Sequence, residues 1–143
     1  MSLQKQAEQV LLLDSPAAII DSLHFSSGVP CEAILAARGR KEEMTPLLLA
    51  IIEDFNVCRG RTRWGDDALF LALHLLGEWK EAKAYHPILR MLHLPDIILD
   101  RVFGDALTET VYRVLASVYD GNPKPLYDVV LNEKIDAFMR WNM

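Results

Sequence analysis

Three arginines stand at alternate positions directly before a tryptophan in the stretch CRGRTRWG, residues 58–65. The four residues are Arg59, Arg61, Arg63 and Trp64. Planar guanidinium groups bind carboxylates and phosphates through paired hydrogen bonds and stack on aromatic rings. This stretch could therefore hold an acidic partner segment, a phosphorylated peptide or a nucleic-acid backbone. The alternative is a solvated loop neutralised by nearby acids, because exposed ion pairs contribute little to stability.

A second basic group, at Arg38, Arg40 and Lys41, lies nearer the N-terminus. In a stack of helical hairpins, consecutive connections lie on opposite edges, so the two groups need not form one patch. The chain carries a formal net charge of −5, which argues against broad nucleic-acid binding because that requires a basic surface. An unknown protein or acidic peptide is therefore the expected partner of the four residues in the 58–65 stretch.

Two pairs of carboxylates, Asp66 with Asp67 and Asp105 with Glu109, are of the kind that general acid–base catalysis uses in a cleft. Asp66 and Asp105 each end a repeated phrase, WGD and FGD. Because a catalytic residue need not recur, we interpret both aspartates as caps of helix N-termini. An enzyme with a carboxylate or His74 site between hairpins is a secondary alternative.

The histidines and cysteines lack the spacing of a metal site or an activated nucleophile. His86 and His93 are not at ligand spacing, and neither HExxH nor CxxC occurs. His74 fits a hydrogen-bonded core or edge position. Cys31 and Cys58 are expected to be reduced, buried thiols. We assign no catalytic residue, metal or cofactor, and expect a non-enzymatic protein.

The composition, 51% hydrophobic and 24% charged over 143 residues, is typical of one globular domain. No apolar run is long enough to cross a bilayer, and the N-terminal stretch does not resemble a signal peptide. We therefore expect residues 1–143 to form a single soluble, cytoplasmic domain that does not bind membranes.

Apolar residues recur at intervals of three and four rather than two, which predicts an all-α fold. Prolines mark helix starts, where the first turn needs no N–H group, as at Pro16, Pro46 and Pro125. The predicted helices span residues 3–13, 16–24, 30–38, 46–57, 67–77, 86–93, 95–102, 106–119, 124–131 and 133–142.

Helix starts share a period of about 40 residues, which lies in the range of HEAT and armadillo repeats. Glycine precedes one series of helices at 28, 65 and 104, and proline opens the other at 46, 87 and 125. We predict stacked antiparallel hairpins, a HEAT-like right-handed α-solenoid of about three repeats, with units near 28–57, 65–93 and 104–131. The helix DDALFLALHLL is apolar nearly all round and is expected to be deeply buried.

Both ends depart from the repeat. Residues 1–27 are interpreted as an N-terminal cap, and residues 132–143 as a partial fourth unit with Ile135, Phe138 and Met139 on one helical stripe. A solenoid normally ends in a polar cap, whereas this stretch contains Trp141 and Met143, so its face either packs back or is covered by a second subunit. A homodimer through the C-terminal helix is therefore expected.

The stretch FGDALTETVYRVLASVYDGNPKPLYDVVLNEKIDAFMRW (Phe103–Trp141) resembles an uncharacterised bacterial family, domain of unknown function 1186. Leu71–Leu92 and Val29–Asp54 also resemble this family. The resemblance implies a HEAT-like helical fold, in agreement with the periodicity. Some members carry a C-terminal zinc segment of the SEC-C type, but this chain has no such segment, so no zinc role is transferred.

The leading hypothesis is a non-enzymatic helical-repeat interaction module anchored by the four residues of the 58–65 stretch. Helical stacks present long, shallow surfaces that suit a peptide or another domain. A nucleic-acid or phosphate-binding protein using the same arginines is the alternative, and strong salt dependence of binding would distinguish it.

Overall fold

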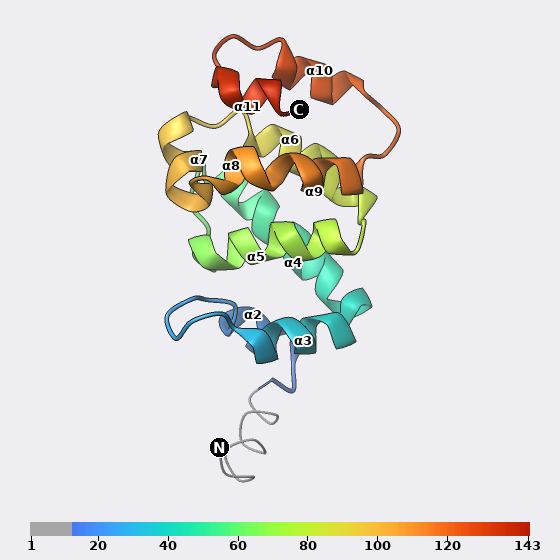
Figure 1. The fold of residues 1–143 in the computed structure, drawn as a ribbon. Helices are drawn as coiled ribbons and strands as arrows, with labels where there is room; N and C mark the ends of the chain where they lie inside the picture. Colours follow the sequence, from blue (N-terminus) through green and yellow to red (C-terminus); the bar gives the residue numbers. More distant parts are fainter. Residues whose placement is uncertain (1–12) are drawn as a thin grey trace. The chain divides into compact units, whose positions relative to one another are not determined.

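The computed structural model describes residues 13–143, and the regular secondary structure of this part of the chain is helical (Figure 1). The predicted all-α class is confirmed for these residues, which contain no β-strand. The helix predicted over 3–13 lies outside them, apart from its last residue. None of the helices within 13–143 is long and apolar enough to cross a membrane.

The helices and their bounds are α2 (Pro16–Asp21), α3 (Cys31–Gly39), α4 (Lys41–Val57), α5 (Asp66–Glu78), α6 (Tyr85–Met91), α7 (Asp96–Phe103), α8 (Ala106–Glu109), α9 (Val111–Val118), α10 (Lys124–Val130) and α11 (Ala137–Trp141). A single 3₁₀ turn, η1 (Ala82–Ala84), precedes α6. The chain divides inside α4 into two compact units, the first ending at Leu47 and the second running from Leu48 to Met143.

The first unit contains α2 and α3, which contact each other, and the N-terminal part of α4. α2 begins at Pro16, as predicted. Ser15 caps it, because the Ser15 Oγ atom accepts a hydrogen bond from the Ala18 N–H group at 3.2 Å. Ile19 and Ile20 are buried on the inner face of this helix. The short helix is thus held by its cap and by two apolar contacts.

The core of the second unit is built around α5, which contacts both α7 and α9. Eight of its thirteen residues are buried, so the predicted deep burial of this helix is confirmed. At Gly77 the backbone of α5 approaches α9 closely, because an added Cβ atom would lie 3.0 Å from both methyl carbons of Val114. The absence of a side chain at this position therefore sets the spacing of the two helices.

The prediction that Pro46 opens a helix is wrong, because α4 begins five residues earlier, at Lys41, and continues through the proline. Proline in a helix loses one backbone hydrogen bond and tends to break the helix. Here the Thr45 hydroxyl donates to the Lys41 carbonyl oxygen at 2.8 Å, which adds a hydrogen bond within the affected turn. The seventeen-residue helix therefore tolerates proline in its second turn.

The helix predicted over 106–119 is two helices, α8 and α9, separated at Thr110. Thr110 has a φ of −126°, outside the helical region. Its hydroxyl lies 2.8 Å from His74 Nε2 on α5 and 3.3 Å from the Ala106 carbonyl oxygen. A threonine hydroxyl that bonds the carbonyl four residues earlier competes with regular helical backbone, and the break lies at such a threonine.

The helix predicted over 133–142 is shorter than expected, because α11 spans only Ala137–Trp141. Asp136 caps it, its Oδ1 accepting from the Met139 N–H group at 3.1 Å. The predicted apolar stripe is also wrong in part. Ile135 precedes the helix, and Phe138 remains 68% exposed, whereas Ile135 and Met139 are buried.

Candidate functional site

The arginine loop, residues 58–65, connects α4 to α5 within the second unit (Figure 1). Its backbone bends near its start, where Arg59 and Gly60 have φ values of 53° and 103°. A Cβ atom at Gly60 would lie 2.5 Å from Cγ2 of Ile98, on α7. Glycine at this position therefore allows the loop to lie directly against α7.

The carboxylate of Asp54, near the end of α4, anchors the second half of the loop. Its Oδ2 atom accepts a hydrogen bond from the Thr62 hydroxyl at 3.0 Å and one from the Arg63 N–H group at 3.1 Å. Cys58 Sγ lies 3.8 Å from the other carboxylate oxygen. The Arg63 N–H bond, followed by the Thr62 hydroxyl, lowers the pKa of Asp54 below its usual 3.8, because both favour the ionised form.

Arg101 of α7 anchors the first half of the loop. Its Nη2 atom donates to the Gly60 carbonyl oxygen at 2.5 Å, and its Nε atom donates to Asp66 Oδ2 at 3.0 Å. The prediction that Asp66 caps α5 is therefore wrong. Gly65, with a φ of 89°, is the N-cap of this helix, and Asp66 forms an ion pair with Arg101 instead. One guanidinium group thus joins α7 to the loop and to the first residue of α5.

Asp105 occupies the N-cap position of α8, as predicted, but its side chain makes no capping hydrogen bond. Its φ of −62° and ψ of −22° are already helical, whereas a capping side chain normally needs an extended backbone to reach the first-turn N–H groups. The predicted bond from this carboxylate is therefore wrong, and the Asp105 side chain is exposed.

The arginine side chains of the loop, Arg59, Arg61 and Arg63, are exposed to solvent. The guanidinium groups of Arg59 and Arg61 make no hydrogen bond or ion pair with any other residue in 13–143. The guanidinium of Arg63 lies over the Trp64 ring, 4.4 Å from the ring centroid, in a cation–π contact. The neighbouring acid Asp66 is engaged by Arg101. The structure therefore brings the four predicted site residues together on one ordered loop.

The histidines of the second unit have structural hydrogen bonds. His74 Nδ1 lies 2.8 Å from the Phe70 carbonyl oxygen and Nε2 lies 2.8 Å from Thr110 Oγ1, which confirms the predicted hydrogen-bonded position. His86 Nε2 lies 2.7 Å from Asp120 Oδ2. Within residues 13–143, no group of three or more His, Cys, Asp or Glu side chains is placed to hold a metal ion.

The two cysteines are not buried, and this prediction is wrong. Cys31 lies in the exposed first turn of α3, and Cys58 follows the last residue of α4 in the arginine loop. Both are free thiols. Their apolar character therefore does not place them in the core, because both stand at helix ends, where the chain meets solvent.

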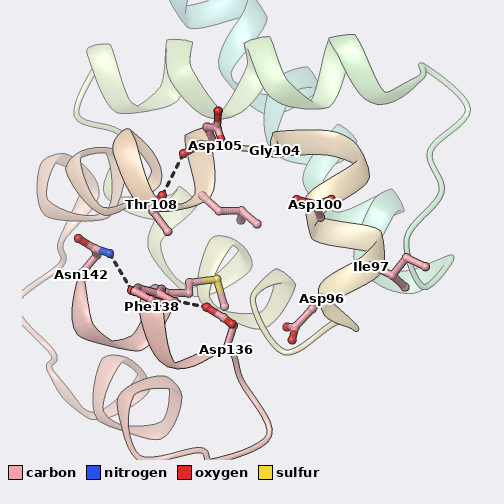
Figure 2. Close-up of a pocket in the computed structure, with 11 residues that line it drawn as sticks. Asp96, Ile97, Asp100, Gly104, Asp105, Thr108, Asp136, Phe138 and Asn142 are labelled. Atoms are coloured by element: carbon pink, nitrogen blue, oxygen red, sulfur yellow. Dashed lines mark hydrogen bonds between the residues drawn. The ribbon is translucent and has the colours of Figure 1, made fainter.

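A groove that we call the acidic groove lies between α7, α8 and α11, with a volume of about 830 Å³ (Figure 2). Four aspartates are among its lining residues, namely Asp96 and Asp100 on α7, Asp105 directly before α8 and Asp136 directly before α11. No lysine, arginine or histidine is among its lining residues. The remaining lining is largely apolar and comes from Ile97, Leu107, Phe138 and Met139.

Sequence reasoning missed the two anchors of the loop and the whole of the acidic groove. Asp54 contacts Thr62 from eight positions away, and Arg101 contacts Gly60 from 41 positions away. No motif marks either pair, because each depends on how α4 and α7 come together around the loop. The spacing of the groove aspartates in the sequence does not indicate that α7 and α11 lie on either side of one groove.

The comparisons with known proteins identify relatives without an assigned activity. Residues 16–142 match the family described as protein of unknown function DUF1186. Uncharacterised proteins of Chlamydia muridarum and Chlamydia trachomatis are each 34% identical to this chain over 106 residues. The match covers 71% of this chain but only 42% of either relative, so the chain spans less than half of their length. No solved structure matches it. The chain belongs to the DUF1186 family.

Proposed function

We propose that this protein is a non-enzymatic interaction module that binds an acidic segment of a partner protein through Arg59, Arg61, Arg63 and Trp64. One observation carries the proposal: the backbone of the loop is held at both ends while its cationic groups face solvent. Asp54 and Arg101 supply the two anchors. A loop that is already ordered loses little conformational entropy on binding, so more of its contact energy appears as affinity.

The types of the exposed residues support the same function. Arginine and tryptophan contribute most to binding free energy when they become desolvated in an interface. The side chains of Arg59 and Arg61 have no partner within residues 13–143 and can each take a carboxylate in a paired hydrogen bond. Arg63 is already oriented by the Trp64 ring. An acidic segment would therefore meet two unpaired guanidinium groups, one guanidinium group that is already oriented, and one aromatic ring.

The arrangement of helices that we propose for the module is a HEAT-like right-handed α-solenoid acting in the cytoplasm. In a stack of hairpins, the first helices of successive repeats contact each other, and so do the second helices. In the second unit α5 contacts α9, and α6 contacts α10. These are the pairs that the hairpin units at 65–93 and 104–131 require.

The test is a quantitative pull-down from cell lysate with three baits. The first is the wild type, and the second carries Arg59→Ala, Arg61→Ala and Arg63→Ala. The third is a matched control that removes three exposed lysines outside the loop, Lys83, Lys124 and Lys134. Circular dichroism first establishes equal helicity of the three baits. We expect the wild type and the control to enrich the same proteins, and the arginine variant to lose them.

Recovery of the same proteins by all three baits would contradict a role for the loop. Loss of the enriched proteins after nuclease treatment would indicate that nucleic acid bridges them, and binding would then fall steeply with salt because phosphate contacts release counterions. Binding to a protein should survive the nuclease.

A further inference from the structure

We propose that the acidic groove receives the arginine loop of a second copy of this chain, in a two-fold dimer in which each copy donates one loop and receives one. The inference rests on the proposed function, because it names a partner for the same loop. It is also consistent with the homodimer through the C-terminal helix that the sequence predicts, because α11 forms one wall of the groove.

Charge complementarity identifies the occupant. The lining carries four carboxylates and no cation, and the two arginines nearest to it in sequence are engaged elsewhere. Arg101 binds the Gly60 carbonyl oxygen and Asp66, and Arg140 donates to the Ile135 carbonyl oxygen at 3.0 Å. An occupant must therefore bring its own positive charge, and Arg59, Arg61 and Arg63 of a second copy supply it.

The carboxylates are available to such an occupant. Asp96, Asp100 and Asp105 are exposed and form no ion pair within residues 13–143. Asp96 and Asp100 are one turn apart on α7, a spacing at which like charges repel. A guanidinium group placed between them would relieve this repulsion. Asp136 is different, because its side chain already caps α11.

The apolar part of the groove matches the remaining part of the loop. Ile97 of α7 is 80% exposed and Phe138 of α11 is 68% exposed, and both are among the residues that line the groove. Large apolar side chains exposed around a groove are typical of an interaction surface. The Trp64 ring and the hydrocarbon stems of the arginines can cover these side chains while the guanidinium groups reach the carboxylates.

The positions of loop and groove on α7 favour a reciprocal contact. Asp96, Ile97 and Asp100 face the groove, whereas Ile98 and Arg101 hold the loop on the neighbouring face of the same helix. The loop cannot enter its own groove while Arg101 and Asp54 hold it. In a two-fold dimer the same two surfaces meet twice, so both loops and both grooves are filled.

The test is a charge exchange followed by analytical ultracentrifugation. The groove variant carries Asp96→Lys and Asp100→Lys, and the loop variant carries Arg59→Glu and Arg61→Glu. The matched controls reverse exposed charges that do not line the groove: Asp128→Lys with Glu133→Lys, and Lys124→Glu with Lys134→Glu. Circular dichroism shows which variants retain the helical fold.

The wild type and both controls should dimerise, whereas the dissociation constant of each variant alone should rise at least about tenfold, because like charges then face each other. An equimolar mixture of the groove and loop variants should dimerise again. In that heterodimer the unchanged loop meets the unchanged groove, and the two reversed surfaces also attract. Recovery in the mixture excludes misfolding as the cause of the loss.

A wild type that stays monomeric at every concentration would overturn the inference, as would a mixture that fails to recover. If the wild type is monomeric but loses lysate partners on Arg59→Ala, Arg61→Ala and Arg63→Ala, the proposed function stands and only the second copy is wrong. If the loop variants alter neither dimerisation nor capture, both proposals fail.

Discussion

Among single residues, Asp54 does most to fix the shape of the arginine loop. Its carboxylate accepts from the backbone of Arg63 and from the Thr62 hydroxyl, and these bonds lower its pKa. A carboxyl group whose pKa is lowered by folding stabilises the folded state at pH values above its unfolded pKa. That stabilisation is lost as the pH falls through the folded value, when the carboxylate takes up a proton.

We therefore expect Asp54→Asn, which mimics the protonated group, to lower the Tm at neutral pH. The difference from the wild type should shrink as the pH falls below 3.8, because the wild type then loses the same charge. Thermal melts over a pH series measure this difference. Asp128→Asn, at an exposed position, serves as the control. A difference that stays constant down to low pH would show that the charge of Asp54 is not what holds the loop.

His74 and Thr110 form a second polar contact that joins α5 to the start of α9. Because the Phe70 carbonyl can only accept, the proton of a neutral ring lies on Nδ1, and Nε2 accepts from the Thr110 hydroxyl. The break between α8 and α9 at Thr110 thus coincides with a bond between helices.

We expect Thr110→Val to lower the free energy of unfolding by about 1–2 kcal/mol, because the ring nitrogen loses its partner in a part-buried position. Urea denaturation followed by circular dichroism measures the change. Thr45→Val is the control, since the Thr45 hydroxyl bonds only within its own helix turn. Equal effects of the two substitutions would argue against the bond to His74.

At the scale of elements, the closest approach of two helices is that of α5 and α9 at Gly77. A glycine inside a helix normally costs about 1 kcal/mol relative to alanine, so alanine would ordinarily stabilise this position. Here an added Cβ atom would lie 3.0 Å from two carbons of Val114, and a β-branched side chain in a helix has little freedom to move away.

We expect Gly77→Ala to destabilise the protein by about 1 kcal/mol, because overpacking outweighs the gain in helix propensity. In a Val114→Ala background the same substitution should become stabilising. A double-mutant cycle in urea measures the coupling between the two positions. Gly39→Ala is the control, since nothing lies within 4 Å of a Cβ atom there. The same sign in both backgrounds would show that Val114 is not the obstacle.

The sequence predicts most of the helices but only part of the candidate site. Periodicity predicts the helices because each buried face repeats along the chain, as on α9, where Val111, Val114, Leu115 and Val118 are buried. The bond between Thr110 and His74 is not predicted, because it joins residues 36 positions apart in the sequence. The candidate arginines are evident from their spacing. Their anchors Asp54 and Arg101 are not, because each contact forms only once the helices have come together.

For the molecule as a whole, we expect association to depend on where the charges lie more than on the net charge. The net charge is −5, yet three arginines stand together on one loop and four carboxylates line one groove. Attraction between these two surfaces acts over a distance that depends on the salt concentration. Raising the ionic strength from about 0.01 M to about 1 M shortens the screening length from about 30 Å to about 3 Å.

We therefore expect the dissociation constant of the proposed dimer to rise over this range of ionic strength, with unchanged helical content. Sedimentation at several salt concentrations, with circular dichroism of the same samples, separates loss of association from loss of fold. A dimer that becomes tighter with salt would indicate an interface held by apolar contacts, and attention would then move to Phe138 and Trp141.

The arginine loop and the acidic groove share α7, because Arg101 of this helix holds the loop while Asp96 and Asp100 of the same helix line the groove. A ligand that shifts α7 when it binds the loop changes the affinity of the groove, and thermodynamic reciprocity requires the converse change to be equal in size. In the proposed dimer, once one loop has docked, the second would dock within the same complex at a high effective concentration. The two loop–groove contacts should therefore form and break together, and a dimer with only one of them formed should be rare.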